Sequence, residues 1–294
     1  MVKKNNFLIG TDPEYGIFDL TSNFAYPPIN LIRDKNVNAL FNKKQPEHWI
    51  FSQLIKPKTL LHMDGSALEL EITPSNNPKN LWDNIQCGIE LIKNLLNPFD
   101  DLEMSHLPTL PWDINKYTKE NVGDEVIHLT RFGCDADLDA FDENKEQEEE
   151  DAEKHPFRYF GGHIHLGMPG ELLEKTFEIP EILAMICSVY WGNLCTFNTK
   201  YNKEEKQRLY RYGKPGRYRV QNHGIEYRSP SNSWTSNYNV VKNIFISTEY
   251  IINAFNNETI GIKILNLTED TKNAILNFDK VTCKKLYIEA LKIN

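Results

Sequence analysis

Short stretches in which apolar and polar residues alternate recur along the chain, and four of them hold two reactive side chains at alternate positions. The four pairs are Asp12 and Glu14, Glu69 and Glu71, His163 and His165, and Glu226 and Arg228. Alternation with a period of two predicts a β-strand, in which side chains i and i+2 share a face about 7 Å apart. Four such strands side by side would form one wall of carboxylate, imidazole and guanidinium groups. Burying that wall is costly unless it binds something charged.

The clearest strand pattern lies in residues 60–73. Apolar residues at 68, 70 and 72 alternate with the two glutamates, and Asp64-Gly65 marks a turn before them. Further strands are predicted over residues 7–20, 125–132, 159–168 and 224–230. Pro13 removes a backbone donor from the first of these, so we expect an edge, a bulge or a strand start there.

Helical periodicity is strongest over residues 78–96, where Asn77 can cap the helix, Pro78 fits the first turn and Asn97-Pro98 ends it. Residues 180–197 are apolar around most of the helix surface, which predicts burial. An amphipathic helix is predicted over 238–255, followed by two short helices, one of them capped by Thr268. Residues 21–58 and 99–124 lack a periodic pattern and are predicted to be irregular.

Strands and helices follow one another without a regular βαβ alternation, which favours an α+β fold with a largely antiparallel sheet. A chain of 294 residues can bury a sizeable core. We expect one domain over residues 1–294, with the helical part 236–294 packed on it.

The formal net charge is -8, and residues 142–154 contribute -6 of it. This segment is predicted to be an acidic, flexible insert. The remaining chain lacks the basic bias of a duplex-DNA binder, so nucleic acid is not an expected partner.

Cysteine usage and hydropathy predict a cytoplasmic location. The five cysteines form no C-x-x-C pair, which favours reduced thiols, and Cys187 and Cys195 lie in an apolar helical stretch and are expected in the core. The apolar run near the N-terminus is too short for a signal peptide, and no run reaches the length of a membrane span.

Each motif also has a structural interpretation. Taken alone, the Glu69 pair fits an amphipathic surface strand, and the Glu226 pair fits a cross-strand salt bridge. The segment Gly161-Gly162-His163-Ile164-His165-Leu166-Gly167 is more specific, because adjacent glycines let backbone or ligand approach closely. Its alternative interpretation is two hydrogen-bonded histidines under a loop.

A basic and aromatic segment over residues 203–221 precedes the last strand. Its candidate phosphate-binding residues are Arg211, Lys214, Arg217 and Arg219, and the strand that follows adds Arg228. Each guanidinium can donate two parallel hydrogen bonds to an anion. A single-stranded nucleic-acid groove is the competing interpretation, which the acidic faces disfavour.

Two other motifs give no site. Asp135, Asp137, Asp139 and Glu146 have the spacing of a calcium loop, but Ala140 stands where the turn needs glycine, so a surface loop is predicted. No P-loop lysine motif and no G-x-G-x-x-G is found, so a nucleotide would bind in another way.

Taken together and in order, these motifs resemble the phage-type carboxylate–amine ligase family, type 2, which is similar in fold to glutamine synthetase and glutamate–cysteine ligase. The resemblance covers residues 7–235. It rests on Gly10-x-Asp12-x-Glu14, Asp64-Gly65-x-x-x-Glu69-x-Glu71-x-x-Pro74, Phe132-Gly133-Cys134-Asp135, the Gly161–Gly167 segment, Tyr212-Gly213-Lys214-x-Gly216-x-Tyr218-Arg219 and Gly224-x-Glu226-Tyr227-Arg228.

The resemblance implies a curved antiparallel sheet, with helices on its convex face, whose concave face binds ATP and magnesium, or manganese in its place. It implies activation of a carboxylate as an acyl phosphate and attack by an amine. The metal ligands would be Glu14, Glu69, Glu71, His163 and Glu226, with Asp12 beside them as a ligand either directly or through water. Arg217, Arg219 and Arg228 would face the phosphates, and His165 would lie nearer the carboxylate substrate, so that Arg228, Arg219 and His165 are the expected catalytic residues.

The sequence-based hypothesis is therefore a single-domain, ATP- and magnesium-dependent ligase that joins a small-molecule or peptide carboxylate to an amine. The host cytoplasm is implied for a phage-encoded chain, and a homo-oligomer is compatible with the sequence. Two alternatives stay open: a metal-dependent amidase that uses the same wall to activate water, and a non-catalytic nucleotide or metal sensor.

Overall fold

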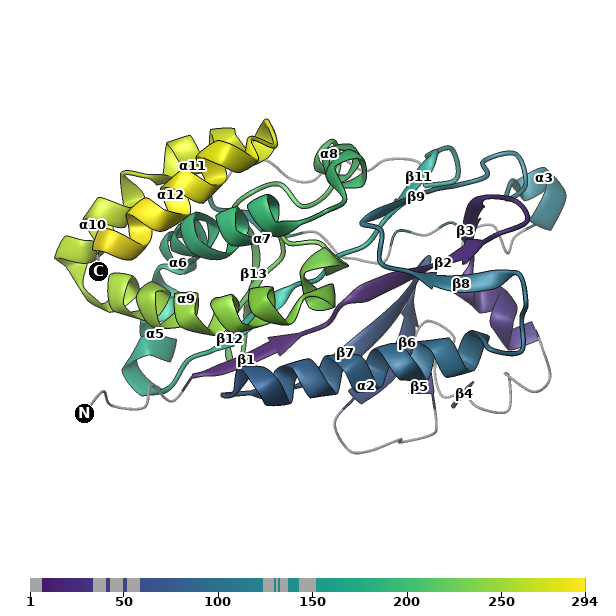
Figure 1. The fold of residues 1–294 in the computed structure, drawn as a ribbon, viewed down its shortest axis with the longest axis horizontal. Coiled ribbons are helices and arrows are strands. Elements are labelled where there is room, and N and C mark those ends of the chain that lie inside the picture. The colour runs from purple at the N-terminus through teal and green to yellow at the C-terminus, as the bar shows by residue number, and fades with distance from the viewer. Residues whose placement is uncertain are drawn as a thin grey trace.

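A computed structural model describes residues 7–33, 41–42, 50–51, 59–123, 130, 132, 137–142 and 152–293. Within them the chain forms a large antiparallel sheet with helices packed on one face (Figure 1). The predicted α+β class with a largely antiparallel sheet is thus confirmed. Most of the predicted strand 125–132 and most of the acidic insert 142–154 lie outside the described residues.

The sheet runs in the spatial order β10-β13-β14-β12-β1-β7-β6-β5-β4, and β2 joins it through β7 and extends to β3 and β8. Its central strands are β1 (Leu8–Thr11), β2 (Glu14–Asp19), β6 (Thr59–Asp64), β7 (Ala67–Ser75), β12 (Ile164–Gly167), β13 (Arg217–Gln221) and β14 (Gly224–Tyr227). Its outer strands are β3 (Phe24–Tyr26), β4 (Phe41–Asn42), β5 (Ile50–Phe51), β8 (Leu102–Ser105) and β10 (Leu138–Asp139). A separate two-stranded ladder pairs β9 (Thr109–Pro111) with β11 (Phe157–Tyr159).

The helices form two groups along the chain, one interspersed with the strands and one after the last strand. The first comprises α2 (Pro78–Leu96), α3 (Lys119–Val122), α5 (Gly170–Glu178), α6 (Pro180–Cys187), α7 (Asn193–Asn198) and α8 (Asn202–Leu209), with a π-helical turn η3 (Ser188–Gly192) between α6 and α7. The second comprises α9 (Tyr238–Asn256), α10 (Glu258–Leu265), α11 (Thr268–Leu276) and α12 (Lys280–Ile293). Short 3₁₀ turns are η1 (Pro28–Arg33) and η4 (Asn232–Ser236).

Helix α2 has the bounds and the cap that its local sequence predicts. The Asn77 side chain accepts hydrogen bonds from the backbone N–H groups of Lys79 and Asn80, and Pro78 occupies the first turn, where its missing N–H costs nothing. The alternating apolar residues of β7 and the apolar stripe of α2 belong to one buried cluster. Glu69 and Glu71, which alternate with those apolar residues, therefore face away from α2.

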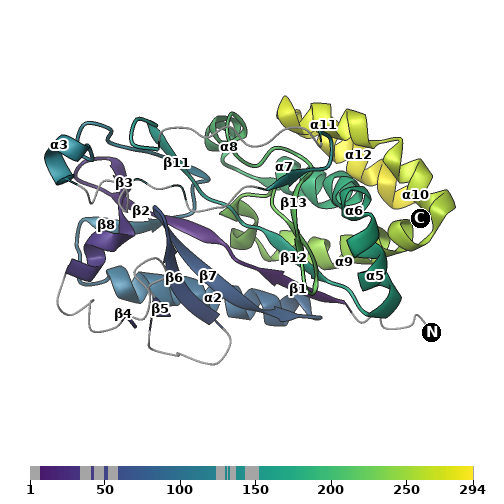
Figure 2. The ribbon, with the colours of Figure 1, turned by 180° about the vertical axis from the view of Figure 1, so that it is seen from behind.

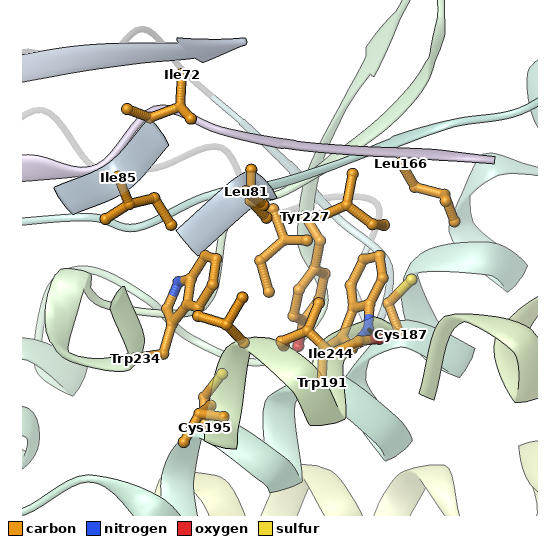
Figure 3. Packing of buried hydrophobic residues seen from close by; sticks show 14 of the residues in the cluster. Ile72, Leu81, Ile85, Leu166, Cys187, Trp191, Cys195, Tyr227, Trp234 and Ile244 are labelled. Carbon is orange, nitrogen blue, oxygen red and sulfur yellow. Dashed lines mark hydrogen bonds between the residues drawn. The ribbon is translucent and has the colours of Figure 1, made fainter. Parts of the chain in front are cut away.

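The core lies between the sheet and the helices (Figure 3). It combines Tyr227 and Leu166 from the strands with Trp191 from η3 and Ile244 from α9. Cys187 and Cys195 are also buried in this region, as expected, and burial raises the pKa of the Cys195 thiol above its ordinary value.

The C-terminal helices are tied to this core by buried hydrogen bonds. The Tyr190 hydroxyl donates to the carbonyl of Ala290, and the Asn193 amide donates to the Thr271 hydroxyl oxygen. Three helices follow α9, rather than the two predicted. Thr268 does not cap α11, because its hydroxyl donates back to the carbonyl of Leu265.

Three sequence-based boundaries differ from the structure. The strand predicted over 7–20 breaks at Asp12-Pro13, where β1 ends and β2 starts with new partners. The strand predicted over 159–168 is two strands separated by residues 160–163, because Gly162 pairs its N–H with Pro230 in the η4 connection instead. Residues 99–124, predicted to be irregular, contain β8, β9 and α3, which are too short to show a period.

None of the described helices is both long enough and apolar enough to cross a membrane.

Candidate functional site

The four polar pairs lie on neighbouring strands of the sheet, in the order β14, β12, the β1–β2 junction and β7. The register places His165 opposite both Glu226 and Gly10, and Glu14 opposite Glu69. Figure 2 shows the sheet from the side opposite to that of Figure 1, with β1, β7 and β12 labelled. Strand alternation and sheet order together therefore gather the predicted polar wall on one surface.

The middle of the wall is built around the carboxylate of Asp12. One oxygen, Oδ1, lies 3.2 Å from His163 Nδ1, and the other, Oδ2, lies 3.0 Å from His165 Nε2. His163 Nδ1 is also 3.2 Å from Glu226 Oε1. Both histidines therefore face the same side, as the strand period predicts, and they share one carboxylate.

This arrangement shifts the protonation of its members. Burial raises the pKa of Asp12, but the nearby His165 and His163 outweigh it and hold that pKa well below its usual range. Burial and the charge of Arg228 lower the pKa of His163, but Asp12 and Glu226 outweigh them and raise this pKa from its ordinary value to about 9. The carboxylates of Asp12 and Glu226 thus favour the protonated form of the His163 imidazole, which lies 3.2 Å from each of them.

One half of the wall is acidic. Glu69 faces Glu14 across the β2–β7 ladder and lies 3.7 Å from His62 Nε2 on β6. Burial raises the pKa of Glu69, and the charges of Asp12, Glu14, Asp64 and Glu71 raise it further. Carboxylates crowded in this way repel one another, which is the electrostatic condition that a bound cation relieves.

The predicted metal ligands differ in their local surroundings. Glu14 is buried and accepts a hydrogen bond from the Gly161 N–H at 2.7 Å through Oε2. Glu71 is exposed on the same face of β7 as the half-buried Glu69. The structure thus brings Glu14, Glu69, His163 and Glu226 together and leaves Glu71 at the outer margin of the wall.

The other half of the wall is rich in arginine. Arg228 forms a close ion pair with Glu226, and its Nε lies 3.5 Å from Asp137 Oδ2. Arg217 Nη1 donates to Asp137 Oδ1 at 3.0 Å. Arg219 is more exposed, with Nη1 3.8 Å from Glu226 Oε2.

Asp137 lies in a different environment from the one predicted for it. The prediction of a surface loop over the calcium-like spacing is wrong for this residue, because Asp137 is buried between two arginines. The misassignment arises because a strand of two residues, β10, pairs with β13 and carries Asp137 inward. Asp135 and Glu146 lie outside the described residues.

The remaining predicted phosphate-binding residues, Arg211 and Lys214, have contacts of other kinds. The Arg211 guanidinium stacks 4.1 Å from the centre of the Phe132 ring. Lys214 lies in the turn before β13, where its carbonyl accepts a hydrogen bond from the Ser229 hydroxyl at 2.7 Å.

Three further side chains join the site. The Tyr212 hydroxyl is 2.7 Å from His163 Nε2, and the Gln221 amide donates to Glu226 Oε2 at 2.7 Å. His223 Nε2 is 3.4 Å from His165 Nδ1. Tyr212 belongs to one of the motifs quoted above, which is a sequence signal. Gln221 and His223 have none, because only the β13–β14 hairpin brings them to the wall.

A divalent cation fits the side chains of the wall. Asp12, His165 and Glu226 each offer a ligand atom, and these atoms lie within 4.8 Å of one another. Carboxylate oxygens suit both magnesium and manganese, whereas the imidazole is a ligand that softer divalent ions such as zinc prefer. Glu226 is one of the predicted ligands and Asp12 was expected beside them, so the cluster adds His165, which was expected nearer the carboxylate substrate.

The back of the sheet holds these strands in place. Tyr227 points opposite to its neighbours Glu226 and Arg228, and its hydroxyl donates to Ser188 in η3 at 3.0 Å. A Cβ at Gly192 would lie 2.7 Å from that hydroxyl. The glycine at this position of the π-helical turn therefore leaves room for the tyrosine.

An antiparallel sheet with helices on one face and a charged, metal-compatible wall on the other defines an α+β protein with a candidate active site on the open face of the sheet. Residues 150–272 match the model of the family described as Phage phiEco32-like COOH.NH2 ligase-type 2. This match confirms the resemblance to the phage-type carboxylate–amine ligases. The matched segment includes His163, His165, Glu226 and the arginines, and the acidic pairs at 12–14 and 69–71 precede it. No curated protein matches the chain.

Proposed function

We propose that this protein is an ATP- and magnesium-dependent carboxylate–amine ligase. The observation that carries the proposal is the division of one wall into an acidic half and an arginine half, joined at Glu226. A cation on the acidic half and phosphates on the arginine half would each meet opposite charge. The family match over residues 150–272 supports the ligase class.

The proposed reaction has two steps. A carboxylate oxygen of the acid substrate attacks the γ-phosphorus of ATP, the bond to the β-phosphate oxygen breaks, and ADP leaves. The amine nitrogen then attacks the acyl carbon of the resulting acyl phosphate, inorganic phosphate leaves, and the amine loses a proton as the amide forms. Positioning and charge neutralisation dominate phosphoryl transfer, which is what such a wall provides.

The chain's own residues have distinct roles in this proposal. Glu14, Glu69, Glu71, His163 and Glu226, together with Asp12, would hold magnesium, which supplies charge neutralisation at the phosphate oxygens. Arg219 and Arg228 would stabilise charge at the transferred phosphoryl group, with Arg211, Lys214 and Arg217 binding the rest of the polyphosphate. His165 would lie nearest the carboxylate substrate. The antiparallel sheet with its helices on one face is compatible with the glutamine-synthetase-like fold that this chemistry implies.

The first test is calorimetry of ATP binding with and without magnesium. Arg219→Ala is the informative variant, because the guanidinium is about a third exposed and its loss leaves the buried network intact. We expect magnesium-dependent binding in the wild type that weakens about tenfold or more in Arg219→Ala, in the range measured for charged contacts. Lys242→Ala on α9 is the control for loss of one exposed positive charge and should bind as the wild type does.

Turnover assays, run beside the calorimetry, distinguish the alternatives. Hydrolysis of amides without nucleotide would favour the metal-dependent amidase. Tight ATP binding, with no ADP released under any mixture of acids and amines, would favour the nucleotide sensor. Either result would contradict the ligase proposal.

A further inference from the structure

Two arginines of the candidate phosphate site already hold an anion that belongs to the protein. The Asp137 carboxylate is buried and offers one oxygen to each guanidinium, with Oδ1 3.0 Å from Arg217 Nη1 and Oδ2 3.5 Å from Arg228 Nε. A phosphate group presents two oxygens to two guanidiniums in the same manner. Asp137 therefore occupies the position in which these arginines would bind a phosphate.

Neither arginine depends on Asp137 as its only anionic partner. Arg228 is also held by its close ion pair with Glu226, and Arg217 Nη2 lies 3.4 Å from Asp139 Oδ2. If the Asp137 carboxylate left, both guanidiniums would keep a partner that orients them. Their positive charge would then be only partly compensated, which favours an incoming anion.

The backbone that follows Asp137 is hydrogen-bonded to its neighbours, so a movement of the side chain is the simplest route for this exchange. Leu138 pairs with Tyr218 across β10 and β13, and the N–H of Ala140 donates to the carbonyl of Gly216 at 3.1 Å. The 3.5 Å contact to Arg228 Nε is long for a charge-assisted hydrogen bond, which makes it the weaker of the two contacts of this carboxylate.

We propose that Asp137 is a built-in competitor for the phosphate subsite formed by Arg217 and Arg228, and that polyphosphate binding displaces its carboxylate. Asp137 would thereby set the affinity for the nucleotide. The inference deepens the proposed function and rests on it for the identity of the ligand. The chemistry recognised by the subsite, however, is that of a polyphosphate and needs neither a base nor an acceptor substrate.

The test compares Asp137→Asn with the wild type, using inorganic tripolyphosphate and ATP with magnesium as probes in calorimetry. The amide preserves the shape of the side chain and removes its charge. We expect both probes to bind about tenfold more tightly to the variant, a size typical of coupling between competing ligands. Asp139→Asn is the matched control two residues along the chain, because Asp139 pairs with Arg217 at 3.4 Å, whereas Asp137 lies against both arginines, and its effect should be less than about threefold.

Unchanged or weaker binding of both probes by Asp137→Asn would overturn the inference. If the wild type binds magnesium-ATP in that case, the proposed function stands and only the role of Asp137 falls. Tighter tripolyphosphate binding by the variant, without ADP release under any acid and amine mixture, would support the subsite and count against the ligase.

A second measurement does not require the variant to fold. In wild-type protein labelled at arginine Nε, tripolyphosphate should shift the Nε–Hε resonances of Arg217 and Arg228, with Arg217→Lys identifying one of them. Displacement of Asp137 predicts that both resonances move together. Shifts confined to Arg219 and other exposed arginines would contradict the proposal.

Discussion

At the scale of single residues, Arg228 combines a structural position with its proposed role in binding phosphate. Its guanidinium is buried and lies between the carboxylates of Glu226 and Asp137. Removing one member of a buried ionic network leaves charges without compensation. A loss of activity in an Arg228 variant would therefore combine a lost ligand contact with a weakened fold.

We expect Arg228→Ala to lower the free energy of unfolding by about 3 kcal/mol, because two buried carboxylates lose a cation. Urea unfolding followed by circular dichroism measures this. Arg219→Ala is the comparison, since Arg219 also faces Glu226 but is partly exposed. Its effect on the unfolding free energy should stay below about 1 kcal/mol. Equal destabilisation by the two substitutions would contradict the assignment.

Asp279 provides a test of pH dependence away from the site. It precedes α12, and hydrogen bonds from the Thr282 hydroxyl and from the N–H groups of Thr282 and Val281 hold the pKa of its carboxyl below the ordinary value. A depressed pKa in the folded state adds stability above the unfolded pKa, and this contribution is lost as the pH falls through the folded pKa.

Asp279→Asn should therefore lower Tm at neutral pH, and the difference from the wild type should shrink as the pH falls below about 4. Thermal unfolding measured from pH 7 to the acid limit of folding checks this. Asp100→Asn, which removes an exposed charge in a turn, is the control for the loss of one negative charge. A difference that grows towards acid pH in Asp279→Asn would refute the capping argument.

At the scale of elements, the connection between β11 and β12 explains the two adjacent glycines. Gly161 forms an isolated bridge with Ser231, and the carbonyl of Gly162 accepts a hydrogen bond from the Trp234 indole at 2.7 Å. A Cβ at Gly162 would lie 2.4 Å from the carbonyl oxygen of Ser231. The close approach of two backbones therefore places His163 at the start of its strand.

Gly162→Ala should cost about 2 kcal/mol of stability, because the added methyl group meets fixed backbone and forces the η4 connection to shift. The same shift should move His163 and weaken magnesium binding. Gly10→Ala is the matched control on the adjacent strand, since a Cβ there would make only ordinary contacts of 3.4 and 3.5 Å. Thermal unfolding of the two variants, each with and without magnesium, separates the effects. A Gly162 variant as stable as the Gly10 variant would contradict this account.

At the scale of the whole molecule, charge separates along the open face of the sheet. Glu69 lies among four carboxylates, those of Asp12, Glu14, Asp64 and Glu71, whereas the arginines lie beyond β12. A protein without bound cation thus stores electrostatic repulsion at one end of its site. Binding of magnesium would relieve it and stabilise the fold by linkage.

Glu69→Gln tests this directly through the sign of its effect. Without metal, the neutral amide should raise the unfolding free energy by roughly 1 kcal/mol, or about 2–4 °C in Tm, because it removes repulsion. With magnesium, the wild type should gain stability and the variant should gain much less. Asp101→Asn, which removes an exposed carboxylate near β8, serves as the control. Destabilisation of metal-free Glu69→Gln would indicate that the acidic half is already compensated.

The sequence predicts most securely those features that local interactions dictate. Helix α2 depends on Asn77, Pro78 and an apolar stripe that are all contiguous in the chain. The β6–β7 hairpin follows in the same way from Asp64-Gly65 and the alternation after it. Side chains at i and i+2 of one strand share a face, so the common facing of Glu69 and Glu71 within β7 was also determined locally.

What the sequence alone determined is thus the class of fold, the polar pairs and the motif order that resembles the phage-type carboxylate–amine ligases. The tertiary structure decided which strands are neighbours, where the β1–β2 break puts Asp12, and how β10 buries Asp137 between Arg217 and Arg228. The reason is physical: a strand's period fixes the face of a side chain, whereas its partners across the sheet come from contacts between segments far apart in the chain. Two-residue strands, and hairpin turns such as the one that holds His223, are too short for a local sequence pattern to predict those contacts.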